Sequence, residues 1–280
     1  MSGMSTLAWQ RVQQIGELQV LTTLSSPGTL RRETLMPIIG LIGGIAPPST
    51  IEYYKLLIEK YRARHEESFP HIVINSIGLA AMLALVAANN LDALTDFLAH
   101  EIDRLARAGA EIAIITSNTS HIVYDRLQPR ARIPLVSIVE ATRDYVLAAG
   151  MRRVGLIGSR FVMEGTFYSE VFARKGLSVA VPGPVERSFI DKEYQSNFIY
   201  GRFPAAARVR ILEIVTQMAR REGIEGVVLG GTELPLALGD TSGLSLRFFN
   251  STLIHVERVI GLMYPAPKPA HPQPYAERRL

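Results

Sequence analysis

Short apolar runs alternate with longer amphipathic stretches along most of the chain. Ile38–Ile42 and Ile112–Ile115 are continuous apolar runs, which is typical of strands buried on both faces of a sheet. In Leu91–Ala108, leucine and isoleucine recur every three or four positions, which predicts an amphipathic helix with one buried face. Strands and helices that alternate in this way predict an α/β fold with parallel sheets covered by helices.

The same pattern gives bounds for the expected elements. The expected strands are Ile38–Ile42, His71–Ser76, Glu111–Thr116, Pro134–Ser137, Val154–Ile157, Leu177–Val181, Gly226–Leu229 and Leu244–Phe248. The expected helices are Pro47–Arg62, Leu91–Ala108, a segment that ends at Ala149, Glu164–Lys175, Phe189–Tyr200, Pro204–Glu222 and Thr252–Met263.

Two pairs of short segments repeat along the chain at nearly one offset. Gly40–Gly43 recurs as Gly155–Gly158, 115 residues later, and each closes an apolar run. Ser117–Thr119 and Gly231–Glu233 also each follow an apolar run, 114 residues apart. Such a repeat indicates a duplicated half, and therefore two similar lobes related by a pseudo-two-fold axis. Parallel sheets bind ligands at the carboxyl ends of their strands, so both turns should line one cleft between the lobes.

The two ends of the chain differ from this alternating region. Residues 1–36 show no strand pattern and are expected to form an N-terminal extension, poorly ordered or weakly helical; a transit peptide is the alternative. Residues 265–280 begin with five prolines in ten positions, which predicts a disordered tail.

Composition and charge exclude several kinds of function. Most of the formal charge of +4 lies in the two tails, so the folded region lacks the basic stripe of a nucleic-acid-binding domain. The chain has no cysteine, which excludes disulfides, thiolate catalysis and zinc–thiolate sites. No apolar run approaches the roughly 18 residues of a membrane span, and no histidines and carboxylates stand at metal-ligand spacing. We therefore expect a cytoplasmic protein without a metal.

Four motifs resemble those of the aspartate/glutamate racemase superfamily. They are Gly40–Thr50, a glycine turn that opens a helix; Ser117–His121, where the family has Cys-Asn-Thr-Ala-His; Gly231–Glu233, where it has Cys-Thr-Glu; and Asn250–His255, which resembles Asp-Thr-Thr-x-x-His. The resemblance runs from about Ile38 to Leu262. It implies two similar α/β lobes, activity without a cofactor on a small acid, and a homodimer.

The resemblance also implies how the chain is divided. The first lobe would consist of residues 37–137 together with 246–264, because the C-terminal strand and helix of the family return to it. The second lobe would consist of residues 138–245.

The chain departs from the family at the two reactive positions. In the family, two cysteines face each other across the substrate carbon, one removing the α-proton and the other delivering a proton to the opposite face. Here Ser117 and Gly231 stand in their places. A serine hydroxyl needs a neighbouring base to become reactive, and glycine carries no proton, so the two-thiol mechanism cannot operate.

The motifs nevertheless provide candidate site residues. The candidate catalytic groups are Ser117, Glu233, His121 and His255. The candidate substrate-binding residues are Gly44, Ala46, Pro47, Ser49, Asn118, Thr119, Gly231 and Thr232. Each has a structural alternative: a tight turn for the glycines, helix capping for the polar residues, a favourable helix-end charge for Glu233, and buried structural roles for the histidines.

Two functional hypotheses remain open from the sequence. The first is an enzyme that moves a proton at a carbon next to a carboxylate or carbonyl, with backbone N–H groups of Gly44, Asn118 and Thr232 stabilising the enolate. Racemisation is the family default, and a lyase, decarboxylase or cyclase activity is an alternative. The second is a non-catalytic protein that binds a small acid. Because Ser76–Met82 carries no charge, a mono-anionic or more apolar ligand suits the cleft better than aspartate, unless Arg160, Arg187, Lys192 or Arg202 enters it.

Overall fold

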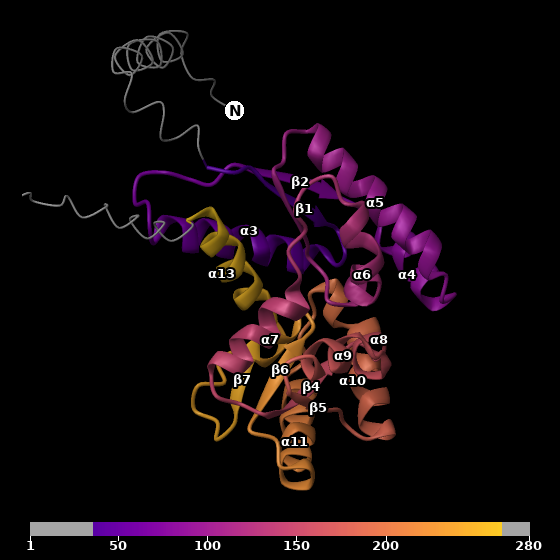
Figure 1. The fold of residues 1–280 in the computed structure, drawn as a ribbon. Coiled ribbons are helices and arrows are strands. Elements are labelled where there is room, and N and C mark those ends of the chain that lie inside the picture. The colour runs from indigo at the N-terminus through magenta and orange to yellow at the C-terminus, as the bar shows by residue number, and fades with distance from the viewer. Residues whose placement is uncertain (1–35, 265–280) are drawn as a thin grey trace, which may run out of the picture.

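The chain folds into two α/β lobes, one above the other in Figure 1. The structure, a computed structural model, describes residues 36–264. The expectations for the N-terminal extension and the proline-rich tail fall outside this range, apart from Met36. In the described part, each lobe is built on one sheet whose strands are all parallel, with helices packed against it.

The first sheet has the strand order β2-β1-β3. It contains β1 (Ile39–Gly43), β2 (Ile72–Ser76) and β3 (Ile112–Ile115), and Leu135 adds a single parallel bridge to Ala113 at its outer edge. Strands β1 and β3 are buried along their whole length, as their continuous apolar runs predict.

The second sheet repeats this arrangement with the order β5-β4-β6-β7. Its strands are β4 (Arg153–Gly158), β5 (Ser178–Ala180), β6 (Gly226–Gly230) and β7 (Arg247–Asn250). The repeated glycine segments of the sequence form β1 and β4, which take equivalent central places in the two sheets. The predicted fold, two similar lobes with parallel sheets, is therefore confirmed.

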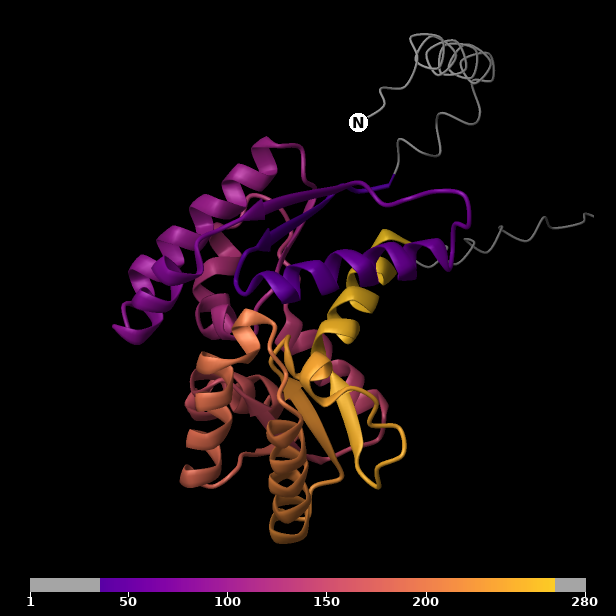
Figure 2. The same cartoon turned by 180° about the vertical axis from the view of Figure 1, so that it is seen from behind.

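The helices lie on both sides of the sheets (Figures 1 and 2). Their bounds are α3 Pro47–Arg62, α4 Leu79–Ala87, α5 Leu91–Arg107, α6 Tyr124–Leu127, α7 Ile138–Ala148, α8 Arg160–Glu164, α9 Phe167–Ala173, α10 Pro184–Ser196, α11 Ala205–Glu222, α12 Leu234–Leu238 and α13 Ser251–Met263. Short 3₁₀ segments cover Thr119–Val123, Gln128–Arg130 and Phe198–Tyr200.

Helix α5 shows how local sequence sets an element. Asn90 caps it by accepting a hydrogen bond from the N–H of Ala93 at 3.1 Å. Leu94, Leu98 and Ile102 form its buried stripe against the first sheet. The predicted bounds of α5 and α3 agree with the structure to within one residue.

Two helices are exchanged between the lobes. Helix α7 follows Leu135, the residue that makes the single bridge at the edge of the first sheet. Its residues Ile138 and Val146 nevertheless pack in a cluster with Val154 and Phe172 of the second lobe. Helix α13 follows β7 of the second sheet and crosses in the opposite direction, lying beside α3 in Figure 2.

The buried face of α13 belongs to the core of the first lobe. Val256, Val259 and Ile260 share a cluster with Leu41 and Leu57. Because α7 and α13 also contact each other, the two exchanged helices link the lobes through apolar packing rather than through a loose linker.

Several predicted elements were wrong. Strand β7 pairs with β6, so the C-terminal strand extends the second sheet and does not complete the first lobe; only the helix that follows it returns there. The division of the chain into lobes otherwise stays a prediction. The expected strand Pro134–Ser137 makes only the bridge at Leu135, and the expected strand at Leu244–Phe248 begins at Arg247 instead.

Three further helical regions differ from expectation. Leu79–Ala87 forms α4, which periodicity does not predict because its nine residues are apolar on every face. The expected helix Glu164–Lys175 is shortened to α9, because Gly165 has an extended backbone, and the unexpected α8 precedes it. The helix expected at Phe189–Tyr200 is α10, which spans Pro184–Ser196.

The exchanged helix α13 provides a test of this packing. Ile260→Ala removes a side chain that is 1% exposed and should lower the free energy of unfolding by about 2–5 kcal/mol. Leu262→Ala, on the same helix but 43% exposed, should change it by less than about 0.5 kcal/mol. Urea denaturation measures both. Equal losses would contradict the docking of α13 on the first lobe.

Candidate functional site

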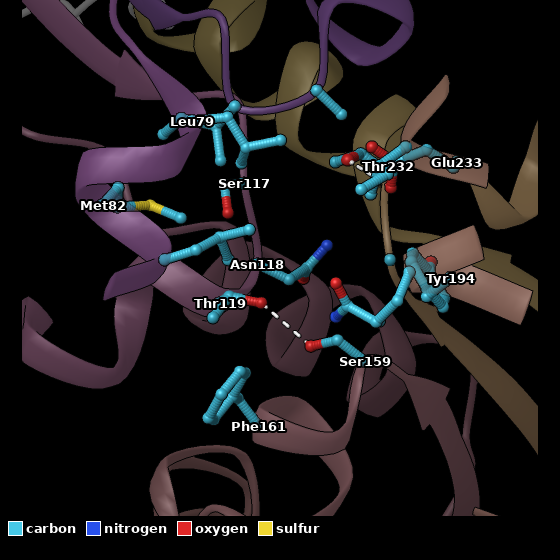
Figure 3. A pocket seen from close by; sticks show the side chains of 17 residues that line it. Leu79, Met82, Ser117, Asn118, Thr119, Ser159, Phe161, Tyr194, Thr232 and Glu233 are labelled. Atoms are coloured by element: carbon cyan, nitrogen blue, oxygen red, sulfur yellow. Dashed lines mark hydrogen bonds between the residues drawn. The ribbon is translucent and has the colours of Figure 1, made fainter. Parts of the chain in front are cut away.

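A pocket lies between the lobes, at the carboxyl ends of their central strands (Figure 3). Its cavity volume is about 50 Å³, so the space between the lobes is narrow. Its polar lining consists of Ser117, Asn118, Thr119, Ser159, Tyr194, Gln195, Thr232 and Glu233. Its apolar lining includes Ile45, Leu79, Met82, Leu83, Phe161 and Ile199.

The turn after β3 is tied to the second lobe by hydrogen bonds. The hydroxyl of Tyr168 donates to Asn118 Oδ1 at 2.6 Å, and Asn118 Nδ2 donates to Ser251 Oγ at 3.3 Å. Thr119 Oγ1 lies 3.0 Å from Ser159 Oγ across the lobe boundary. These contacts fix the Asn118 amide with its nitrogen available to the pocket, where one of its two hydrogens has no acceptor among residues 36–264.

Ser117 lines the pocket but is not activated. Its Oγ accepts only a long bond of 3.4 Å from the N–H of Ser120 among the described residues. The nearby imidazole of His121 binds the Ser117 carbonyl at 2.8 Å, not its hydroxyl. Without a base on the hydroxyl, Ser117 is suited to polar contact rather than to nucleophilic attack.

The turn after β6 contains the one carboxylate of the lining. Glu233 is 4% exposed, and Ser49 Oγ lies 2.6 Å from its Oε1 and 2.7 Å from Thr232 Oγ1. Thr232 donates to Oε2 at 3.1 Å. Burial raises the pKa of the Glu233 carboxyl, and the hydrogen bonds from Ser49 and Thr232 offset part of this rise. A buried carboxyl with a raised pKa in a pocket is a candidate for general acid–base catalysis.

The glycine turn after β1 shapes the pocket but does not offer it a free donor. Gly44 has φ of +79°, and a Cβ there would lie 2.3 Å from the carbonyl oxygen of Ile77. Its N–H already donates to Thr50 Oγ1 at 2.9 Å, so it is not available to the anion that the sequence assigned to it. Ala46, with φ of +57°, reaches the pocket lining.

Both candidate histidines use both ring nitrogens inside the protein. His121 Nδ1 donates to the carbonyl of Ser117, so Nε2 must accept the N–H of Ile138 at 3.2 Å. His255 Nε2 donates to the carbonyl of Val136 at 3.0 Å, so Nδ1 accepts the hydroxyl of Tyr53 at 2.8 Å. Burial lowers the pKa of His121 to about 4 and that of His255 to about 3. Both are neutral at pH 7 and neither lines the pocket.

The candidate site residues from the sequence fall into two groups, those that line the pocket and those that do not. Those brought together around the pocket are Ala46, Ser117, Asn118, Thr119, Gly231, Thr232 and Glu233. Those outside its lining are Gly44, Pro47, Ser49, His121 and His255, of which Ser49 still touches the site through Glu233.

Several lining residues were not found from the sequence. Ser159, Phe161 and Tyr194 line the pocket, and no motif marks them. The four basic residues considered as ligand partners, Arg160, Arg187, Lys192 and Arg202, are absent from the lining, which contains no Lys, Arg or His within the part of the chain that the structure describes. Arg187, for example, pairs with Glu164 at 3.3 Å.

Between Met36 and Tyr264, no cluster of three or more His, Cys, Asp or Glu side chains converges as metal ligands would. No helix in that range is both long and apolar enough to cross a membrane.

The chain has two similar parallel sheets with a pocket between the ends of their strands. This arrangement defines a two-lobe α/β protein of the racemase type. The chain belongs to the Asp/Glu/hydantoin racemase family, whose model matches residues 42–259. An aspartate racemase homologue from Pyrococcus horikoshii OT3 is 33% identical, with a TM-score of 0.71 over 81% of this chain and 99% of that one.

Two further similarities are weaker in sequence. The aspartate racemase of Picrophilus torridus shares the fold, with a TM-score of 0.68 at 15% identity over 81% of this chain and 94% of that one. The broad specificity amino-acid racemase RacX of Bacillus subtilis (strain 168) is 22% identical over 145 residues, which is 50% of this chain and 63% of that protein. The match therefore spans less than two thirds of this relative's length.

The buried histidines predict a loss of stability in acid. As the pH falls below about 6.5, histidines protonate in the unfolded chain, whereas in the folded protein His121 stays neutral until the pH approaches about 4 and His255 until it approaches about 3. The unfolded state then binds more protons, so the free energy of unfolding falls, by roughly 3 kcal/mol for each histidine at pH 4. Glu233, whose pKa is raised, acts in the opposite direction below its folded pKa.

Urea denaturation between pH 7 and pH 4 measures this loss, and substitution isolates the histidine part. His255→Asn should reduce the slope of stability against pH in this window. Leu262→Ala, an exposed substitution that removes no titratable group, should leave the slope unchanged. An unaltered slope in His255→Asn would show that the buried imidazole does not resist protonation.

Proposed function

We propose that this chain is a cofactor-independent enzyme that moves a proton at a carbon next to a carboxylate or carbonyl, with Glu233 as the proton carrier. The observation that carries the proposal is the place of Glu233. Its carboxyl lines the pocket at the carboxyl end of β6, next to the position of the second family thiol, in an environment that raises its pKa.

The proposed step needs one base. Ionised Glu233 takes the proton from the substrate carbon, the C–H bonding electrons move to the adjacent carbonyl or carboxylate oxygen, and an enolate forms. The same carboxyl, now protonated, returns a proton to the carbon. Ser49 and Thr232 hold the carboxyl in place through their hydrogen bonds. Return of a solvent-derived proton to the same face gives isotope exchange. Racemisation requires in addition that the enolate turns over in the pocket before the proton returns.

The first-lobe turn is suited to hold the substrate oxygens. Asn118 Nδ2 has a hydrogen free for an acceptor in the pocket, and the hydroxyls of Ser117 and Thr119 lie beside it. Amide and hydroxyl donors placed in advance stabilise an enolate oxygen as its charge develops. They carry no formal charge, so they suit a carbonyl or a single carboxylate.

The lining favours a substrate with one acidic or carbonyl group and an apolar substituent. A second carboxylate would enter a pocket whose described lining has no cation and already contains Glu233, so its lost hydration would be uncompensated. Leu79, Met82 and Phe161 instead offer an apolar wall. A 5-substituted hydantoin, which has an acidic C–H next to a ring carbonyl, fits this description and appears in the family name.

Isotope exchange tests the proposed reaction. In deuterated water, the wild-type protein should incorporate deuterium at the acidic carbon of at least one bound ligand. Glu233→Gln removes the proton carrier at nearly constant shape and should lower this rate by roughly 10²–10⁴-fold. Glu59→Gln, an exposed glutamate on α3, should leave it unchanged. The rate should also fall in acid, with an inflection above 4.5 because burial raises the pKa of Glu233.

A substrate panel tests the preference separately. It consists of phenylalanine, mandelate, 2-phenylpropionate and 5-benzylhydantoin, set against aspartate and glutamate, with mass spectrometry and calorimetry as readouts. We expect binding and exchange for members of the first group and neither for the dicarboxylates. Tight binding without exchange would favour a non-catalytic binding protein, and turnover of aspartate would overturn the proposed preference.

A further inference from the structure

Gly231 has no room for a side chain, because Tyr194 occupies the space. A Cβ added at Gly231 would lie 1.5 Å from Tyr194 Oη and 2.5 Å from Tyr194 Cζ. Even alanine is therefore excluded while the tyrosine keeps its position. The backbone does not require glycine here, since Gly231 is not among the residues with positive φ. Glycine at this position is explained by the close approach of the phenol.

Tyr194 enters the site from α10 of the second lobe. Its ring packs edge-to-face on Phe198 with 5.3 Å between centroids, inside the core that also contains Leu229. The side chain is 4% exposed, and the residue lines the pocket on the same side as Thr232 and Glu233 (Figure 3). A rigid, buried ring thus holds one polar atom at the pocket wall.

The hydroxyl of Tyr194 has no hydrogen-bond partner among residues 36–264. The N–H of Leu234 faces it but is bonded to the carbonyl of Gly231 at 3.1 Å, and an N–H could not accept the phenol hydrogen in any case. Burial raises the pKa of Tyr194, and the nearby Glu233 carboxyl adds to this, so the phenol keeps its hydrogen at neutral pH. Buried hydroxyls are normally paired, so an unpaired one at a pocket points to a missing partner.

We propose that the Tyr194 hydroxyl takes the place of the second family thiol, and donates a hydrogen bond to the carbonyl or carboxylate oxygen of the ligand. This inference rests on the proposed function, which supplies a small acid or carbonyl compound as the ligand. The two residues depend on each other in this proposal. Gly231 has no side chain, and the hydroxyl of Tyr194, which comes from α10, occupies the space where a side chain of residue 231 would lie.

The proposal assigns distinct tasks to the groups around the reacting carbon. Ser117 stands at the position of the first thiol and Tyr194 Oη at that of the second, so both faces carry hydroxyls that donate but do not remove a proton from carbon. Glu233, beside Tyr194, remains the proton carrier. A neutral donor next to this carboxyl also attracts ligand oxygens to a wall that would otherwise repel them.

Tyr194→Phe tests the hydrogen bond, because it removes only the oxygen. Calorimetry with phenylalanine, mandelate, 2-phenylpropionate and 5-benzylhydantoin should show dissociation constants raised by roughly 10- to 100-fold for the ligands that the wild-type protein binds. The melting temperature of the ligand-free protein should be unchanged or higher, since no partner in the described chain loses a bond.

Tyr124→Phe is the matched control. Its hydroxyl donates to the carbonyl of Leu135 at 2.9 Å and is not part of the pocket lining. This variant should lose thermal stability and keep its ligand affinity. Unchanged affinity in Tyr194→Phe, or a loss of stability like that of the control, would overturn the assigned hydrogen bond while leaving the proposed function intact. If wild type binds none of the four compounds, the proposed function fails, and this inference fails with it.

A double-mutant cycle tests the shared space independently of any ligand. Gly231→Ala should lower the melting temperature strongly in the wild-type background and little in a Tyr194→Ala background, where the clash is absent. Equal effects in both backgrounds would show that the two residues do not compete for one volume. If Gly231→Ala alone yields no folded protein while the double variant folds, the shared space is supported.

Discussion

The reciprocal packing of α7 and α13 is the constraint on which the pocket depends. Each helix leaves one sheet and completes the core of the other lobe, so neither lobe can shift without disturbing both cores. Hydrogen bonds between the two halves of the chain lie at the pocket in this fixed relation. Ser49 reaches Glu233 at 2.6 Å and Tyr168 reaches Asn118 at 2.6 Å, each pair joining elements from different halves of the chain.

The main property of the pocket lining is its small number of charged side chains. One buried carboxyl, Glu233, is surrounded by hydroxyls and an amide, and the described lining has no cation to hold it ionised. The two buried histidines are not substitutes, because every ring nitrogen is already bonded. The pocket at the two motif turns therefore contains few charged groups in the described part of the chain. Its chemistry is limited to what one carboxyl and fixed dipoles can do.

Much of the fold was predictable because the chain contains two similar halves and because buried parallel strands consist of continuous apolar residues. The turns after β3 and β6 both line the pocket, and their motifs follow strand ends directly. Helix α4 was not predictable from periodicity, because its apolar residues surround it. The sheet that β7 joins is decided by long-range pairing with β6, and no local pattern in Arg247–Asn250 encodes that choice. Tyr194 could not be recognised from the sequence for a similar reason: its importance comes from the space that it fills next to Gly231, which is distant from it in the sequence.

The exchange of helices also affects how the chain can be synthesised. The core of the first lobe includes Ile39 and Leu57 near its beginning and Val256 and Ile260 near its end. A nascent chain can form the first sheet and α3 early, but this core lacks the apolar side chains of α13 until the end of the described region has been synthesised. The second lobe depends on the same segment, because Phe249 and Ile254 belong to the cluster that receives α7. Both cores are therefore completed by one C-terminal segment, and the apolar surface that it covers is exposed to aggregation until that segment is made.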